Sequence, residues 1–140
     1  MYKSVEILKA CLDMSFDNVE IIEEKQNAAY EGFYIPKLNV RSRLAKQTPK
    51  KAGFFVTHYV ADGDGNRPYT VKETLNMLAI CIPDEGAFLF PKEILMEKKI
   101  ITTSVIGKMG FRVYLPTEMA LNASAQKTQA WQAKYYYSVR

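Results

Sequence analysis

Residues 75–90 of this chain read LNMLAICIPDEGAFLF, two apolar runs on either side of the polar sequence Pro83-Asp84-Glu85-Gly86. Two short apolar runs joined by a four-residue loop that contains Pro and Gly are typical of a β-hairpin. Apart from Asn76 near the start of the first run, neither run contains a polar residue that would mark a solvent-facing side. We therefore expect a buried strand over residues 75–82 that pairs with a strand over residues 87–90.

Helices and further strands are predicted on both sides of this hairpin. Apolar residues at helical spacing indicate a helix over residues 2–12, and Pro91 favours a helix that begins there and runs to about Lys98. A closing helix is expected over residues 122–137, whereas residues 18–25 fit a strand or a helix equally well. Additional strands, each rich in aromatic or β-branched residues, are predicted at residues 30–35, 38–44, 54–60 and 111–114.

The predicted elements indicate one domain over residues 1–140 with an α+β fold. Its mixed, mostly antiparallel sheet has about five or six strands, with helices at the N- and C-terminal ends. With 48% apolar and 24% charged residues, the composition is that of an ordinary globular protein. No apolar run approaches a membrane span, and charged residues interrupt the first twelve positions, so we expect a cytoplasmic protein without membrane contact.

Charge is distributed unevenly along the chain. Residues 1–31 contain seven acids and three bases, a net charge of −4, and the remainder contains eight acids and sixteen bases, a net charge of +8, which together give +4. A basic region of this kind attracts anionic partners and speeds their encounter, and the effect weakens with salt.

The basic character is concentrated in residues 37–51, which include no acidic residue. Arg and Lys pair with phosphate oxygens, so this composition predicts a surface that binds polyanions. Alternation over residues 38–44 places Arg41 and Arg43 together on the solvent face of a half-buried strand. An ordinary solvated strand and turn would have similar residues, and this alternative stays open. The six cations are Lys37, Arg41, Arg43, Lys46, Lys50 and Lys51.

Two other groups extend the predicted binding surface. Lys92, Lys108 and Arg112 flank the sheet and could converge with the first group, or they could be scattered surface cations. The closing helix contains Gln129 and Gln132, which can read base edges, and Trp131, which either stacks on a base or packs in the core. The predicted nucleic-acid-binding residues are Arg41, Arg43, Lys46, Thr48, Lys51, Lys92, Lys108, Arg112, Gln129 and Gln132.

Catalytic and metal-binding patterns are weak in this sequence. An acid followed two residues later by lysine, as metal-dependent nucleases of the restriction type require, occurs at Glu23-Glu24-Lys25 and Glu97-Lys98-Lys99. Two such triplets are expected by chance at this composition. The single histidine, His58, has no nucleophile motif beside it, and Asp62-Gly63-Asp64-Gly65-Asn66 fits a hairpin tip better than a calcium loop. We therefore expect no catalytic residues, metal or cofactor.

Four sequence motifs resemble those of one known family. They are RSRLAKQTPKKAGFFV at residues 41–56, FLFPKEIL at 88–95, GKMGFRVYLP at 107–116 and KTQAWQ at 127–132, the last followed by Tyr135 and Tyr136. In this order and spacing they resemble the MepB-like family over nearly the whole chain, from about Tyr30 to Tyr136. The resemblance implies a small bacterial α+β domain that is similar to nucleic-acid-processing folds of the restriction-endonuclease type, an analogy that does not assign an activity.

The predicted function is non-catalytic binding of nucleic acid in a basic groove, with DNA favoured over RNA. Two alternatives stay open from the sequence. One is a metal-dependent nuclease of the restriction-endonuclease type, which would require Glu23 and further convergent carboxylates. The other is an interaction module for an acidic protein partner. The sequence makes no prediction of oligomeric state.

Overall fold

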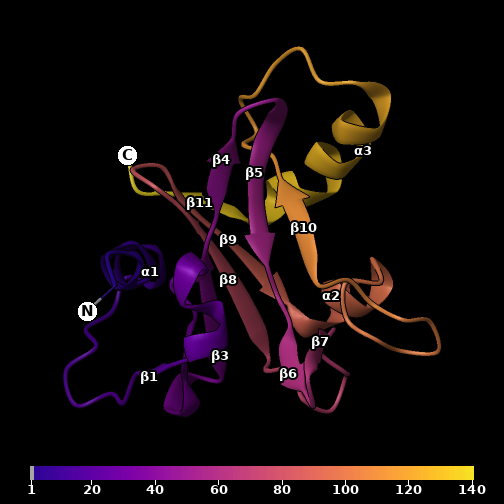
Figure 1. Cartoon of the computed structure of the whole chain (residues 1–140). Coiled ribbons are helices and arrows are strands. Elements are labelled where there is room, and N and C mark those ends of the chain that lie inside the picture. The colour runs from indigo at the N-terminus through magenta and orange to yellow at the C-terminus, as the bar shows by residue number, and fades with distance from the viewer. Residues whose placement is uncertain (1) are drawn as a thin grey trace.

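The computed structural model describes residues 2–140. Short helices lie among the strands in the first and last parts of the chain, and β3 to β9 follow one another without a helix between them (Figure 1). The elements are α1 (Ser4–Leu12), β1 (Ile22–Glu23), η1 (Lys25–Tyr30), β2 (Phe33–Ile35), η2 (Pro36–Leu38), β3 (Val40–Leu44), β4 (Lys46–Thr48), β5 (Lys51–Thr57), β6 (Val60–Asp62), β7 (Gly65–Arg67), β8 (Met77–Ile82), β9 (Gly86–Pro91), α2 (Lys92–Glu97), β10 (Gly110–Val113), α3 (Ala123–Gln132), η3 (Ala133–Tyr135) and β11 (Tyr136–Ser138).

The main sheet has six strands in the order β1-β2-β3-β8-β9-β11. β3 and β8 run parallel, and the other neighbouring pairs run antiparallel. The predicted central hairpin is confirmed, because β8 and β9 pair from Met77–Pro91 to Ile82–Gly86 across the expected turn. The α+β class with a mixed, mostly antiparallel sheet is confirmed as well.

Both faces of this sheet are covered, which explains the continuous apolar runs of β8 and β9. Helix α1 packs on one face, where Val5 and Leu8 meet Ala79, Cys81 and Leu89. The opposite face presents Leu78, Ile80, Ile82, Phe88 and Phe90 to the larger part of the core. Alternate residues of β8 and β9 therefore enter two different apolar clusters, one on each side of the sheet.

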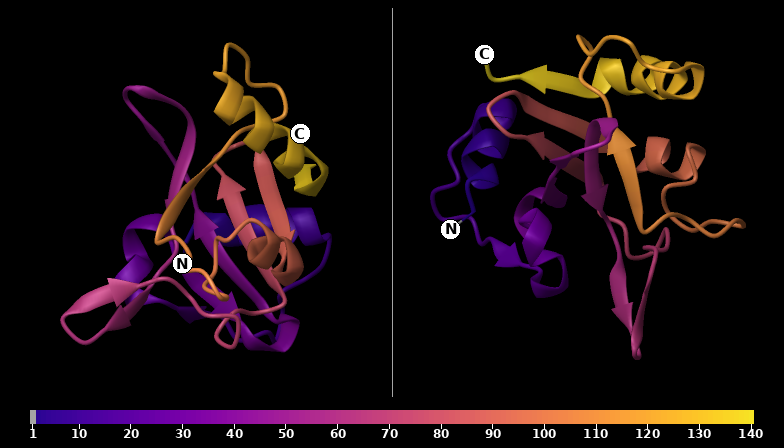
Figure 2. Two further views of the ribbon diagram at one scale, coloured as in Figure 1. Left: turned by 90° about the vertical axis from the view of Figure 1, so that its right-hand side faces the viewer. Right: turned by 45° about the horizontal axis from the view of Figure 1, so that its top comes forward.

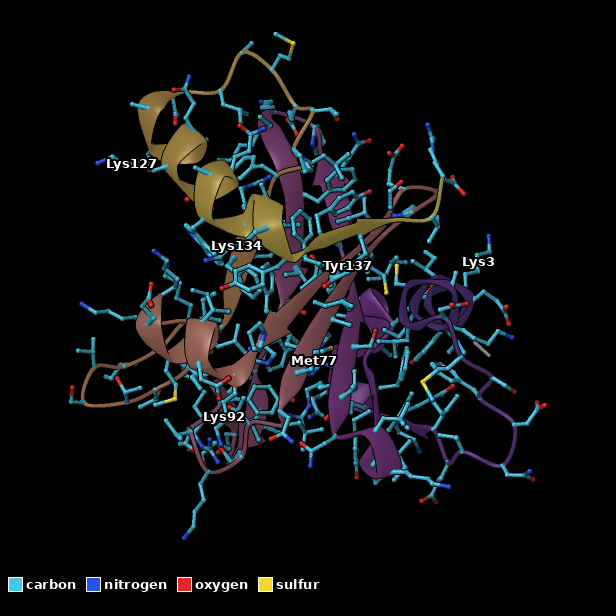
Figure 3. All side chains as sticks on the ribbon, turned by 180° about the vertical axis from the view of Figure 1, so that it is seen from behind. Lys3, Met77, Lys92, Lys127, Lys134 and Tyr137 are labelled. Carbon is cyan, nitrogen blue, oxygen red and sulfur yellow. The ribbon has the colours of Figure 1, made fainter. Side chains whose placement is uncertain are left out.

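A second sheet of three strands, in the order β10-β5-β4, packs over the face opposite α1. Phe54 and Val56 of β5 and Phe111 and Val113 of β10 point into the shared core. Helices α2 and α3 lie beside this sheet, whereas α1 lies on the far side of the molecule (Figures 1 and 3). The small β6–β7 hairpin projects away from the body of the molecule (Figure 2).

The chain end departs from the prediction of one helix over residues 122–137. The α-helix ends at Gln132, and after a single 3₁₀ turn the chain extends as β11 and pairs antiparallel with β9. Gly86 permits this pairing, because a Cβ atom at that position would lie 2.1 Å from the Tyr137 carbonyl oxygen. Residues 136–138 therefore form a strand and do not continue the helix, because the exposed edge of β9 offers backbone hydrogen bonds to β11.

The other boundaries differ less from the sequence-based predictions. The ambiguous segment 18–25 contains strand β1, and η1 follows it. Strand β2 begins only at Phe33, since residues 25–30 form a 3₁₀ segment. None of the helices within residues 2–140 combines the length and the apolar character needed to cross a lipid bilayer.

Phe90 connects the main sheet with the C-terminal helix, and we expect removal of its side chain to lower the stability of the fold. Its ring is fully buried and lies 5.4 Å from the Trp131 ring and 5.7 Å from that of Tyr135, measured between centroids. We predict that Phe90→Ala lowers the free energy of unfolding by about 3–5 kcal/mol. Urea denaturation followed by circular dichroism checks this. Ile106→Ala, at a side chain that is 78% exposed, is the control and is expected to change stability by about 0.5 kcal/mol or less.

Candidate functional site

The two arginines of β3 do not face solvent as predicted. The exposed fraction of the side chain is 0% for Arg43 and 11% for Arg41. Arg41 and Arg43 alternate with Ser42 as expected, but their side of β3 is covered by Glu24 and Tyr69 rather than by water. The prediction that both side chains lie on an open surface is therefore wrong, because it assumed that one face of the sheet is free.

One carboxylate holds both guanidinium groups. Arg43 Nη1 lies 2.7 Å from Glu24 Oε1, and Arg41 Nε lies 3.1 and 3.2 Å from the two Glu24 oxygens. Arg43 also donates to the Tyr69 hydroxyl at 2.9 Å and to the Ser42 carbonyl at 3.0 Å. These five residues are called the buried arginine cluster below. It ties the segment that follows β1 to the strand at the centre of the sheet.

Aromatic rings and a neutral histidine enclose the buried arginine cluster. The Arg41 guanidinium lies 4.4 Å from the centroid of the Tyr69 ring. His58 stacks on the same ring, with a centroid distance of 4.3 Å and an interplanar angle of 24°. Burial, reinforced by the charges of Arg43 and Arg41, lowers the pKa of His58 well below its ordinary value. Burial also raises the pKa of Tyr69. His58 is therefore a neutral structural residue at physiological pH.

The surface cations gather instead around two hollows beside β10. One is lined by Lys98, Lys108 and Arg112 together with Trp131 of α3. The other is lined by Lys50, Lys51 and Arg112 together with the residues that begin α3. Arg112 and Tyr114 line both hollows, so the two meet along β10, and no acidic side chain lines either of them within residues 2–140. The five cations Lys50, Lys51, Lys98, Lys108 and Arg112 define the basic groove.

Arg112 is held in place at the centre of the basic groove. Its Nη1 donates to the Ala52 carbonyl at 2.9 Å and its Nη2 donates to the Thr48 hydroxyl, while the guanidinium carbon lies 5.7 Å from the Phe55 ring centroid. These partners are neutral, so the positive charge of Arg112 is not compensated. A guanidinium fixed in this way loses little side-chain entropy when it pairs with an anion.

The lysines of the basic groove are largely free of internal partners. Lys50, Lys51 and Lys108 are exposed, and no ion pair joins them to an acid among the described residues. Lys98 lies 3.6 Å from a Glu97 oxygen and 5.4 Å from the Trp131 ring centroid. Glu118 borders an adjacent hollow beside Lys51, where it accepts a hydrogen bond from Gly53 N–H at 2.7 Å.

The two glutamines of α3 that were predicted to read base edges are occupied by backbone groups. Gln132 was expected to reach solvent, and that expectation is wrong: it is fully buried, accepts from Tyr114 N–H and donates to the Arg112 carbonyl, both at 2.9 Å. It thereby satisfies the free edge of β10, which has no further strand beside it. Gln129 donates to the carbonyls of Leu115 and Glu118 at 2.8 and 2.9 Å, which fastens the loop that leads into α3.

The remaining predicted residues lie in different places. Lys46 is exposed on β4 and lies 4.8 Å from the Tyr30 ring centroid, while Thr48 orients Arg112. Lys92 begins α2 and does not line the basic groove (Figure 3). The structure therefore unites Lys51, Lys108 and Arg112 with Lys50 and Lys98. Lys98 was not among the predicted binding residues, because its only sequence signal was its place in an acid–lysine triplet.

Acidic residues do not gather into a metal site. Across residues 2–140, no group of three or more His, Cys, Asp or Glu side chains lies close enough to hold a metal ion. Glu24, the centre of the first acid–lysine triplet, is engaged by the two arginines, and Glu97 of the second lies next to Lys98 on an exposed surface.

Removing the charge of Glu24 should leave two guanidinium groups uncompensated in the interior. We predict that Glu24→Gln lowers the free energy of unfolding by about 3–5 kcal/mol, the usual cost of removing one partner from a buried ion pair. Denaturant titration at pH 7.5 measures it. Glu6→Gln, which removes an exposed pair with Lys9 at 3.1 Å, should cost less than about 1 kcal/mol. Equal effects of the two substitutions would contradict a desolvated cluster.

The buried neutral His58 should make stability depend on pH. Its folded-state pKa lies below that of the unfolded chain, so only the unfolded state gains protons as the pH falls below about 6.5. We expect stability to be complete above that value and to fall towards pH 5 by at most about 1.4 kcal/mol per pH unit.

His58→Phe isolates this contribution, because it removes the titrating group and keeps an aromatic ring. The free energy of unfolding of this variant should be nearly flat between pH 7 and pH 5. Glu73 does not interfere in that range, since its hydrogen bonds with Arg67 hold its pKa at about 2 and its contribution falls only below its ordinary value of 4.5. An unchanged pH slope in the variant would show that other groups are responsible.

Comparison with known proteins agrees with this architecture. The model of the MepB-like family matches residues 24–138, which include both the buried arginine cluster and the basic groove. A solved structure described as the crystal structure of MepB is 41% identical, with a TM-score of 0.83, over 99% of this chain and 97% of that one. No curated protein matches the chain. On the strength of the family match over most of its length, this chain belongs to the MepB-like family.

Proposed function

We propose that this protein binds nucleic acid, DNA in preference to RNA, in the basic groove and without catalysing a reaction. One observation supports this most strongly: two adjoining hollows are lined by five cations and, within residues 2–140, by no acid. A surface that serves only solubility normally mixes charges of both signs. A cytoplasmic location remains part of the proposal.

The arrangement of the groove suits the backbone of a nucleic acid strand. Arg112 lies between the two hollows with its guanidinium already oriented by Thr48 and Ala52. Lys50 and Lys51 lie on one side of it and Lys98 and Lys108 on the other. Successive phosphates could therefore meet separate cations along β10, and each contact would release condensed counterions.

The neutral groups of the groove add little readout of base sequence. The side-chain amides of Gln129 and Gln132 are hydrogen-bonded to backbone carbonyl and N–H groups, so they are not free to contact base edges. The groove would accordingly bind through phosphates, which carry no sequence information. Binding that depends strongly on salt and weakly on sequence is the expected behaviour.

The decisive experiment removes three exposed groove lysines at once. We predict that Lys50→Ala/Lys51→Ala/Lys108→Ala weakens binding of a labelled duplex. The slope of log affinity against log salt should become shallower by about 0.9 for each lost phosphate contact, or about 2.7 in total. Fluorescence anisotropy at several salt concentrations provides the measurement. All three side chains are exposed, so the fold should be unaffected.

A second triple variant controls for net charge. Lys3→Ala/Lys25→Ala/Lys37→Ala removes the same number of positive charges outside the groove, from the N-cap of α1, from η1 and from η2. It should retain nearly the wild-type slope. Equal losses in the two variants would indicate a diffuse charge effect and would overturn the groove proposal. Tighter binding of RNA than of DNA of the same sequence would overturn the preference for DNA.

An acidic protein partner is the competing interpretation of the same groove. Poly-glutamate serves as the probe, because it offers carboxylates without phosphates. If poly-glutamate displaces labelled duplex at charge-equivalent concentrations far below those of unlabelled DNA, the groove favours carboxylates and the nucleic-acid proposal fails. Displacement by unlabelled DNA at the lower concentration supports the proposal.

A further inference from the structure

The hollow beside Trp131 is the smaller of the two hollows of the basic groove. Its volume is about 290 Å³, near the lower end of the range for ligand pockets. Its walls come from four parts of the chain: α3, strand β10, Lys108 from the loop before it, and the residues that follow α2. These elements lie together on the right-hand side of Figure 1. A space of this size holds one small ligand rather than a length of strand.

One side of this pocket is apolar and rigid. Trp131 lines it together with Ile100 and Phe111. The indole is anchored from behind, with its ring centroid 5.4 Å from that of Phe90 and 6.5 Å from that of Tyr135. Phe111 is 8% exposed and Ile100 is 2% exposed, so both are fixed by core packing. A planar base or a sugar could lie against such a wall without first ordering it.

The other side of the pocket is strongly basic for its size. Lys98, Lys108 and Arg112 surround a single small hollow, and within the described chain only the Glu97 carboxylate, 3.6 Å from Lys98 Nζ, pairs with one of them. A phosphodiester inside a strand has one negative charge. A terminal phosphate has between about 1.5 and 2 negative charges at pH 7 and three acceptor oxygens. The concentration of three cations therefore suits a terminal phosphate better than an internal one.

We propose that this pocket holds a single nucleotide with a terminal phosphate, its base or sugar against Trp131 and its phosphate among Lys98, Lys108 and Arg112. This inference rests on the proposed binding of nucleic acid and makes it more specific. A free nucleoside monophosphate and the phosphorylated end of a strand share this chemistry. The remaining cations, Lys50 and Lys51, would then hold the strand that leads away from the pocket.

Trp131 is the single tryptophan of the chain, so its emission reports on this pocket directly. The small-molecule probes are adenosine 5′-monophosphate, adenosine and inorganic phosphate. The strand probes are a DNA strand of ten nucleotides with and without phosphate at either end. We expect adenosine monophosphate to quench the emission saturably, with adenosine and inorganic phosphate each at least tenfold weaker. Lys108→Ala should weaken binding of the monophosphate about tenfold. Lys3→Ala, at the N-cap of α1 and far from the pocket, should leave that binding unchanged (Figure 3).

The strand probes separate the two sources of the ligand. At least tenfold tighter binding of a phosphorylated strand than of the unphosphorylated one assigns the pocket to a strand end. Saturable quenching by the monophosphate without that difference assigns it to a free nucleotide. Quenching by inorganic phosphate as strong as by the monophosphate, or a Lys108→Ala response equal to wild type, would overturn the proposal because the base or the cation would then have no role.

Failure of this inference is distinct from failure of the proposed function. If labelled strands bind with the salt dependence expected above, while neither end phosphate nor monophosphate affects Trp131 emission, the pocket proposal is wrong and nucleic-acid binding stands. If the monophosphate binds and labelled strands do not, the pocket is a nucleotide site and the groove does not bind nucleic acid.

Discussion

The buried ion pairs of Glu24 with Arg41 and Arg43 are the interaction around which this fold is arranged. Two guanidinium groups between two sheets would be prohibitively costly if they were unpaired, so the carboxylate must lie where both can reach it. That requirement fixes the segment after β1 against β3 and brings the Tyr69 hydroxyl to Arg43 at 2.9 Å. Burial, together with the charges of Arg43 and Arg41, lowers the pKa of the adjacent His58 and keeps it neutral.

Positive charge is therefore used in two ways in this protein. In the interior, planar guanidinium groups donate to several fixed partners at once, including a carboxylate, a hydroxyl and backbone carbonyls. On the surface, flexible lysines gather around one oriented arginine and keep their charges uncompensated. Arg41 and Arg43 are adjacent to the surface lysines in sequence, yet they stabilise the fold and lie outside the basic groove.

The groove depends on how α3 is docked. Gln132 binds the free edge of β10, Gln129 holds the preceding loop, and Trp131 packs on Phe90 of the main sheet. These contacts place one wall of the groove against the strand that presents Arg112. The fold and the proposed site are therefore coupled: a substitution that loosens α3 would open the groove even where it touches no groove residue.

Local patterns in the sequence determined the class of the fold. The apolar runs on either side of Pro83–Gly86 required a buried hairpin, and Pro91 marked the start of α2 correctly to within one residue. Hydrophobic periodicity also predicted α1 and β3, and aromatic and β-branched composition predicted β5 and β10. The acid-free basic stretch correctly indicated that Lys51 lies on a cationic surface. Arg112, from a separate sequence motif, lines the same hollow as Lys51.

Only the tertiary structure decided which cations face water. Alternation along β3 separates two faces but does not say what covers either. Glu24 and Tyr69, which cover Arg41 and Arg43, come from segments that are distant in the sequence. The same applies to Gln132, whose partners are the unpaired backbone groups of β10, and to residues 136–138, which pair with the edge of β9. Burial, partner choice and convergence of charges depend on contacts between residues far apart in the chain, and local spacing contains no information about them.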